Sequence, residues 1–183
     1  PNVLLAAAHD SETVLLVGGD PLSATTHVSL RLQCREAGVE CHVVHNASVL
    51  TAVAGELGLQ HYRFGPVATL VLPEGNYRPL SPVKQVLQNL ELRFHSLVLL
   101  DIHADDPAAE PRLMTAHEAA VLLLDGGVLP EVLACAAARV GRSDQKLWAG
   151  SLGEMPQADL GQTPHSLVIP GKLHFVEEEA LAT

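Results

Sequence analysis

Three short polar segments each follow an apolar run, which is where ligand-binding residues lie in α/β proteins. Gly18–His27 follows the run at 13–17, and His45–Ser48 follows the run at 41–44. Asp101 ends the most apolar run in the chain. Open α/β sheets bind ligands at the loops that leave the C-terminal ends of their strands. These segments are therefore candidate binding loops.

The residue types in these loops suit ligand binding, but they also suit loops with a purely structural role. In the first loop, two glycines allow the backbone to approach a ligand closely, and Pro21 stiffens the turn. The Gly-Lys-Ser/Thr ending of a phosphate-binding P-loop is absent. The alternatives are an ordinary turn at Gly18–His27, a helix cap at His45–Ser48, and a solvated strand end at Asp101.

Histidines and cysteines show no metal-binding pattern. The chain has 10 histidines, and His42 and His45 point to opposite sides of an extended segment. Neither a His-Glu-x-x-His motif nor a paired-cysteine motif occurs, so we expect no metal. The Gly-x-Ser-x-Gly motif of the α/β-hydrolases is also absent. The cysteines are odd in number and widely spaced, which predicts reduced thiols and a cytoplasmic protein: Cys34, Cys41 and Cys135.

Composition narrows the function classes further. The 183 residues include 11 Lys+Arg and 21 Asp+Glu, which gives a formal charge of −10. This acidity argues against nucleic acid and anionic membranes as partners. Hydrophobic residues make up 48% of the chain, which excludes wholesale disorder. The first residue is Pro1 rather than Met, so we expect the sequence to begin inside a longer protein.

The predicted strands and helices, which must position these loops, alternate along the chain. Apolar runs predict strands at 13–17, 41–44, 68–72, 96–101, 131–139, 147–151 and 166–169. Between them, helices are predicted at 25–37, 48–56, 81–92, 116–124 and 177–182. Ser48, Ser81 and Thr115 are the expected N-caps, and Glu118 completes a capping box with Thr115.

This alternation predicts an α/β architecture in which helices cover a sheet. The pattern breaks near residues 60–68, where Pro66 marks a change. We therefore expect two α/β domains, at 1–65 and 66–183.

Eight segments, in this order, strongly resemble the diphthine synthase family, and the resemblance runs from about Thr13 to Leu181. They are Gly19–His27, Val44–Ser48, Gly58–Gly65, Leu99–Ile102, Arg112–Thr115, Ala138–Gly141, Asp144–Lys146 and Pro164–Gly171. The resemblance implies a tetrapyrrole-methylase-like methyltransferase with two α/β domains, S-adenosylmethionine between them, and a homodimer. It also implies the substrate: the amino group of the 3-amino-3-carboxypropyl histidine of translation elongation factor 2, in diphthamide biosynthesis.

Carried over residue by residue, the resemblance implies a set of cofactor-binding positions. They are Asp20, Ser23, Ser48, Val49, Leu100, Val140 and His165. The sulfonium of the cofactor already activates the methyl group, so the protein mainly has to orient the amine and exclude water. We therefore name no catalytic residue. One hypothesis is that Asp101 orients or deprotonates the incoming ammonium.

The chain also departs from the family. Members of the family begin with a strand, a Gly-Leu-Gly-Leu-Gly type of loop and several dozen further residues, and none of these is present here. We therefore expect an incomplete N-terminal domain. The alternatives are an inactive homologue that keeps a dimer or partner-binding role, or a related tetrapyrrole methylase. His45–Ser48 and Pro164–Pro170 argue against the tetrapyrrole methylase. Neither the number of methyl groups nor esterification of the carboxylate follows from the sequence.

Overall fold

The computed structural model describes residues 2–73, 75, 77–104 and 109–182. It contains two compact units, Pro1–Ala52 and Val53–Thr183. These units are defined by contacts within the structure, so the domain boundary at 65/66 stays a prediction.

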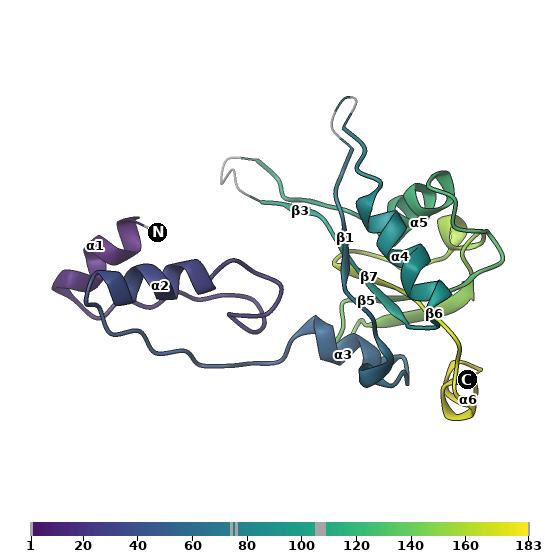
Figure 1. Cartoon of the computed structure of the whole chain (residues 1–183), viewed down its shortest axis with the longest axis horizontal. Helices are drawn as coiled ribbons and strands as arrows, with labels where there is room; N and C mark the ends of the chain where they lie inside the picture. The colour runs from purple at the N-terminus through teal and green to yellow at the C-terminus, as the bar shows by residue number, and fades with distance from the viewer. Residues whose placement is uncertain (1, 74, 76, 105–108, 183) are drawn as a thin grey trace. The chain divides into compact units, whose positions relative to one another are not determined.

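Helices carry most of the regular structure of the first unit (Figure 1). They are α1 (Asn2–Asp10), α2 (Val28–Glu36) and the beginning of α3 (Val49–Glu56). The predicted helices at 25–37 and 48–56 are confirmed, and α1 was not predicted. The Leu50 amide donates to the Ser48 hydroxyl over 3.2 Å, so Ser48 caps α3 as expected.

The strands predicted at 13–17 and 41–44 are wrong, because neither segment pairs with another part of the described chain. Both sequences suit a strand, but a strand exists only when a neighbour satisfies its backbone N–H and C=O groups. Within the described residues of the first unit, no such neighbour lies beside either segment.

The second unit is built on a five-stranded sheet whose order is β1-β2-β7-β5-β6. The first pair is parallel and the other neighbours are antiparallel. All five predicted strands are confirmed within one to two residues at each end: β1 (Ala68–Leu70), β2 (Ser96–Leu100), β5 (Leu133–Ala138), β6 (Lys146–Ser151) and β7 (His165–Ile169). The predicted mixed α/β architecture is therefore confirmed in this unit.

Further elements of the second unit flank the sheet. They are the helices α4 (Ser81–Glu91), α5 (Ala116–Asp125) and α6 (Phe175–Leu181), the 3-10 turns η1 (His61–Arg63) and η2 (Met155–Gln157), and the short hairpin of β3 (Ile102–His103) and β4 (Arg112–Leu113). The predicted helices at 81–92, 116–124 and 177–182 are confirmed. The hairpin was not predicted, because two-residue strands are too short to show a period.

Small and aliphatic side chains form the core between the sheet and α5. On α5 the buried residues are Ala116, Ala119, Ala120 and Leu123. On β5 the residues Ala134 to Ala138 are at most 1% exposed. Alanines on both elements let the helix lie close to the sheet, where the surrounding aliphatic side chains complete the packing.

The two predicted caps in this unit differ in outcome. Thr115 and Glu118 form the expected capping box, in which each side chain accepts from the other residue's backbone amide. The prediction for Ser81 is wrong, because Leu80 occupies the N-cap position and has no capping side chain. Ser81 and Pro82 are the first two residues of α4 instead.

Candidate functional site

Asp20 connects the two candidate loops of the first unit. One carboxylate oxygen accepts from the Leu22 amide at 2.9 Å and the Ser23 hydroxyl at 3.0 Å. The other accepts from His45 Nδ1 at 2.7 Å and the Asn46 amide at 3.3 Å. Gly19 has a φ of +82°, and a Cβ there would meet the Ala47 carbonyl oxygen at 3.4 Å. The loops that follow 13–17 and 41–44 are thus held together.

These donors keep Asp20 ionised. The hydrogen bond from His45 lowers the pKa of the carboxyl well below its usual range, and the Leu22 amide lowers it further. His45 itself is two-thirds exposed, so solvent reaches one side of the pair. The arrangement fixes the shape of both loops.

Three predicted residues of the second unit converge at one edge of the sheet. Val98 pairs with Leu167 on antiparallel strands, and two residues further this register sets Leu100 opposite His165. On the other side of β7, Ala138 pairs with His165, which brings the chain to Val140 two residues later. The structure therefore brings Leu100, Val140 and His165 together.

The His165 side chain is held inside the protein by both ring nitrogens. Nδ1 accepts from the Ala116 amide at 3.2 Å, so Nε2 carries the proton and donates to the Gln162 carbonyl oxygen at 3.1 Å. Burial lowers the pKa of His165, which fits this neutral form. Any ligand at this edge would meet the ring's carbon atoms or the backbone.

Asp101 and the start of α5 border the same edge. One Asp101 oxygen accepts from the Leu72 amide and from His103 Nε2, each at 2.9 Å. Its backbone oxygen accepts from the Met114 amide at 2.9 Å. These contacts tie the ends of the first two strands of the sheet to the residues before α5.

Arg112 and Glu118 form an ion pair beside this edge. Burial alone would raise the pKa of Glu118, but the hydrogen bonds from Arg112 and Thr115 outweigh it and lower that pKa. The carboxylate therefore stays charged at the first turn of α5, where the helix dipole favours a negative charge.

Two further findings concern the described residues only. Across 2–73, 75, 77–104 and 109–182, no three His, Cys, Asp or Glu side chains gather as a metal site. The helices in the described part of the chain are also too short or too polar to cross a membrane.

Comparison with known proteins decides the family. A family model described as Tetrapyrrole (Corrin/Porphyrin) Methylases matches residues 2–156. The diphthine synthase of Methanocaldococcus jannaschii is 39% identical over 185 residues, which cover 97% of this chain and 71% of that protein. The chain belongs to the diphthine synthase family of methyltransferases. The resemblance of the eight segments is thus confirmed.

Other members of the diphthine synthase family agree with this assignment. The diphthine synthase of Methanoregula boonei is 38% identical over 186 residues, covering 100% of this chain and 72% of its own length. The crystal structure of a putative diphthine synthase from Entamoeba histolytica has a TM-score of 0.92 at 32% identity, and the match covers 100% of this chain and 74% of that one. A further diphthine synthase crystal structure has a TM-score of 0.87 at 33% identity, with 99% and 68% covered.

Some residues of this candidate site were not singled out from the sequence. His45 and Asn46 lie inside the segment Val44–Ser48, yet their contacts with Asp20 span 25 and 26 residues, and nothing in the spacing predicted those contacts. The link between His165 and the first amide of α5 spans 49 residues and was equally hidden.

Proposed function

We propose that the chain is an S-adenosylmethionine-dependent diphthine synthase. It methylates the amino group of the modified histidine of translation elongation factor 2, a step of diphthamide biosynthesis. The observation that carries this proposal is identity of 37–39% to curated diphthine synthases over nearly the whole chain. The same proposal places the protein in the cytoplasm, with elongation factor 2 as protein substrate, and as a homodimer.

The loops of the first unit offer backbone groups that suit a ligand with a carboxylate, as S-adenosylmethionine has. Asp20 and Ser23 hold a loop in which Gly18 faces open space, so a ligand can approach its backbone. Ser48 caps α3, and the amide of Val49 takes part in no hydrogen bond with described residues. A free amide at a helix N-terminus suits a carboxylate.

Taken by itself, the second unit offers backbone groups at this edge of its sheet that suit an adenine ring. The Val140 backbone N–H and C=O are unpaired among the described residues, and the residue is only half-buried. An adenine edge offers one acceptor and one donor side by side, which matches such a backbone pair. Leu100 and the carbon atoms of His165 supply apolar contact next to it.

When bound, the cofactor supplies a methyl group that its sulfonium has already activated. The residues of the chain then bind the two substrates, orient the amine and exclude water. A protein nucleophile is unnecessary. An ammonium has no free electron pair with which to accept that methyl group. The residues of the chain would therefore have to hold the substrate amine in its neutral form.

Asp101 is our candidate for handling the ammonium proton. Its Oδ2 is used by Leu72 and His103, while Oδ1 has no partner among the described residues. We expect Asp101→Asn to lower the rate of methyl transfer at neutral pH by about 10²-fold, the size of a general-base contribution. The rate should recover as pH rises and free amine accumulates. A full rate at neutral pH would remove Asp101 from the mechanism.

The experiment that tests the function uses S-adenosylmethionine labelled in its methyl group and three acceptors. They are elongation factor 2 carrying 3-amino-3-carboxypropyl histidine, unmodified elongation factor 2, and a tetrapyrrole. We expect label in the first acceptor only. Label in the tetrapyrrole would make the protein a related methylase. Absence of label from all three would support an inactive homologue.

A further inference from the structure

Arg139 is a buried cation beside one of the expected cofactor positions. It is the first residue after β5 and is 7% exposed, and Val140 follows it directly. Its φ of +53° lies in the left-handed region, which residues other than glycine rarely occupy. Such a conformation persists only where the surrounding structure enforces it, and it is common at ligand sites. The contacts of Arg139 supply this enforcement.

The guanidinium of Arg139 is bound by backbone oxygens of two loops. Nη2 donates to the Asp144 carbonyl oxygen at 2.6 Å, and Nη1 donates to the carbonyl oxygens of Leu160 and Gln162. Nε also lies 2.8 Å from a carboxylate oxygen of Asp144. Asp144 belongs to the turn between β5 and β6, and the other two residues precede β7. The fork of donors on one arginine thus joins both loops to the end of β5.

The backbone of Arg139 is fixed as well, whereas that of Val140 is open. The Arg139 amide donates to the Pro164 carbonyl oxygen at 2.9 Å, and the Arg139 carbonyl oxygen accepts from the Arg142 amide at 3.0 Å. Val140 has no such bond with described residues. Gly161 lets the loop before β7 approach closely, because its φ is +68° and a Cβ there would lie 3.1 Å from Arg139 Nη2. Val140 therefore presents free backbone groups from a rigid position.

One carbonyl oxygen links Arg139 to a second expected cofactor position. The Gln162 carbonyl oxygen accepts from Arg139 Nη1 and also from His165 Nε2, the latter at 3.1 Å. Arg139 thus acts on Val140 through the chain and on His165 through this shared oxygen. The two positions that we assign to the adenosine of the cofactor are held by the same side chain.

Fixed backbone groups can distinguish adenine from its deaminated counterpart, hypoxanthine. Adenine has an acceptor at its ring nitrogen N1 beside a donor at its exocyclic amino group. Hypoxanthine has a donor at that nitrogen beside an acceptor at its exocyclic oxygen. A backbone N–H and C=O that pair with adenine therefore meet like groups on hypoxanthine. A rigid site cannot turn to relieve this mismatch, so the unpaired groups weaken binding.

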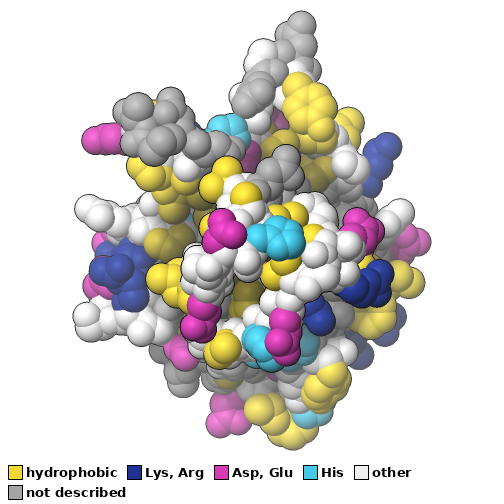
Figure 2. Space-filling view, turned by 90° about the vertical axis from the view of Figure 1, so that its left-hand side faces the viewer, with side chains coloured by type: hydrophobic (Ala, Val, Ile, Leu, Met, Phe, Trp, Pro, Cys, Tyr) yellow, Lys and Arg dark blue, Asp and Glu magenta, His cyan; other side chains and the backbone are white. Residues whose placement is uncertain are grey.

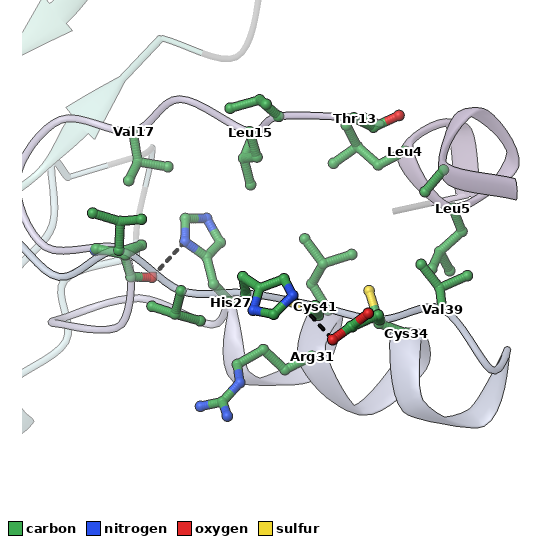
Figure 3. Close-up of a pocket in the computed structure, with 18 of the residues that line it drawn as sticks. Leu4, Leu5, Thr13, Leu15, Val17, His27, Arg31, Cys34, Val39 and Cys41 are labelled. Atoms are coloured by element: carbon green, nitrogen blue, oxygen red, sulfur yellow. Dashed lines mark hydrogen bonds and ion pairs between the residues drawn. The ribbon is translucent and has the colours of Figure 1, made fainter. Parts of the chain in front are cut away.

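The cavity in the first unit is mainly apolar and differs from this arrangement. It has a volume of about 1190 Å³, and many aliphatic side chains line it, among them Leu4, Leu15 and Val39 (Figure 3). His27 Nδ1 lies 2.8 Å from the Pro21 carbonyl oxygen, so that ring nitrogen is engaged. In the view of Figure 2, hydrophobic side chains are likewise open to solvent. Aliphatic side chains contact either purine equally well, so the distinction between them falls to polar groups.

We propose that Arg139 is a positioning residue, which holds the backbone of Val140 and the ring of His165 so that the site selects adenosine over inosine. The inference rests on the proposed function, because that function supplies a cofactor with an adenosine. Arg139 acts through these two neighbours and needs no contact with the cofactor itself.

The test compares the binding of S-adenosylhomocysteine and S-inosylhomocysteine by calorimetry. The two ligands differ only in the base. We expect the wild-type chain to bind the adenosyl compound about 10²-fold more tightly, because two hydrogen bonds are mismatched in the inosyl compound. Arg139→Met keeps an unbranched side chain but has no donor. It should reduce the preference to less than about tenfold, because the backbone of Val140 is then free to adjust.

Two further variants separate positioning from a general loss of structure. Gly161→Ala keeps Arg139 but places a methyl group against its guanidinium, so it should lower the preference in the same way. Arg142→Met is the matched control, because the Arg142 side chain is 69% exposed and pairs with Asp144. It should leave the preference unchanged. Thermal unfolding of every variant is measured alongside, and if Arg139→Met fails to fold, Gly161→Ala decides by the same criterion.

The ratio of the two affinities decides the outcome. A fall in both affinities by the same factor, with the ratio kept, would make Arg139 merely structural and overturn the inference. Equal binding of both ligands by the wild-type chain would also overturn it, while the binding of the adenosyl compound would still support the proposed function. A wild-type chain that binds neither ligand would count against the proposed function as well.

Discussion

Asp20 is a single carboxylate that accepts four hydrogen bonds from two loops. Two donors come from its own loop and two from the loop that begins at His45. The carboxylate therefore cross-links the two loops, through charge-assisted hydrogen bonds and not through a covalent bond. Both the shape of the side chain and its negative charge contribute to this role. A substitution that keeps the shape and removes the charge separates the two contributions.

Asp20→Asn tests that separation. An amide can keep one acceptor oxygen for Leu22 and Ser23, but its NH₂ group cannot accept from His45 or Asn46. We expect the Asn46 amide to exchange with solvent about tenfold faster while the Leu22 amide changes little, and S-adenosylmethionine to bind more weakly in calorimetry. Asp159→Asn is the matched control, because that carboxylate pairs with Lys146 and is 86% exposed. Equal exchange at Asn46 in both variants would contradict the role of Asp20.

Two buried histidines predict how stability depends on pH. His95 is 0% exposed and His165 is 6% exposed, and burial lowers the pKa of each. In the unfolded chain, each histidine has the ordinary pKa of about 6.5. Below that pH each of these histidines binds a proton in the unfolded chain but not in the folded chain. The free energy of unfolding therefore falls as pH falls. The loss is at most about 1.4 kcal/mol per pH unit for each histidine.

The measurement is urea unfolding followed by the fluorescence of Trp148, the one tryptophan in the sequence, between about pH 7.5 and pH 5.5. His165→Gln should flatten the dependence on pH. His42→Gln is the control, since the side chain of His42 is 82% exposed. An unchanged slope in the first variant would show that His165 is not held neutral in the folded state.

At the scale of elements, the start of α5 positions the ring of His165 through the Ala116 amide. The capping box at Thr115 and Glu118 fixes where that helix begins. We expect Thr115→Ala to lower the free energy of unfolding by about 1 kcal/mol, the usual loss for an N-cap.

Ser81→Ala is the matched control for the cap. The sequence predicted Ser81 as an N-cap, but it lies inside α4 and makes no capping hydrogen bond. Its replacement should change the free energy of unfolding by less than about 0.5 kcal/mol. Both variants can be followed by the same urea titration. Equal losses in the two variants would mean that the Thr115 box contributes nothing.

The elements that sequence reasoning found are those whose signal is local. All five strands of the sheet in the second unit were found from runs of apolar residues, and α5 from its cap. The N-cap of α4 was predicted one residue too late. A Ser-Pro pair suits the first two helical positions as well as it suits the N-cap and the first helical position. The segments at 13–17 and 41–44 have the composition of strands, but pairing depends on a neighbour that composition cannot supply.

The candidate site was predictable to a similar degree. The loops that hold Asp20 and Ser48 were found because glycine, proline and polar residues follow apolar runs there, whereas Val140 was named from the family resemblance alone. Contacts that cross the sequence, such as the pair of Asp20 and His45, need the fold. The same holds for His165, which the resemblance marks as a cofactor position and whose ring the fold engages internally.

At the scale of the whole molecule, the acidic charge and the family assignment point the same way. A net charge of −10 disfavours nucleic acid as a partner, which agrees with the protein substrate that we propose. The chain spans 71–72% of the length of the archaeal relatives that it matches.

The central claim is methylation of the modified histidine on its amino nitrogen. The direct measurement is tandem mass spectrometry of the elongation factor 2 peptide that carries 3-amino-3-carboxypropyl histidine, after reaction with this protein and S-adenosylmethionine. We predict one or more added methyl groups on that amino nitrogen, stable to mild base. A peptide of unchanged mass, or a methyl found only as a base-labile ester or on another residue, would contradict the claim.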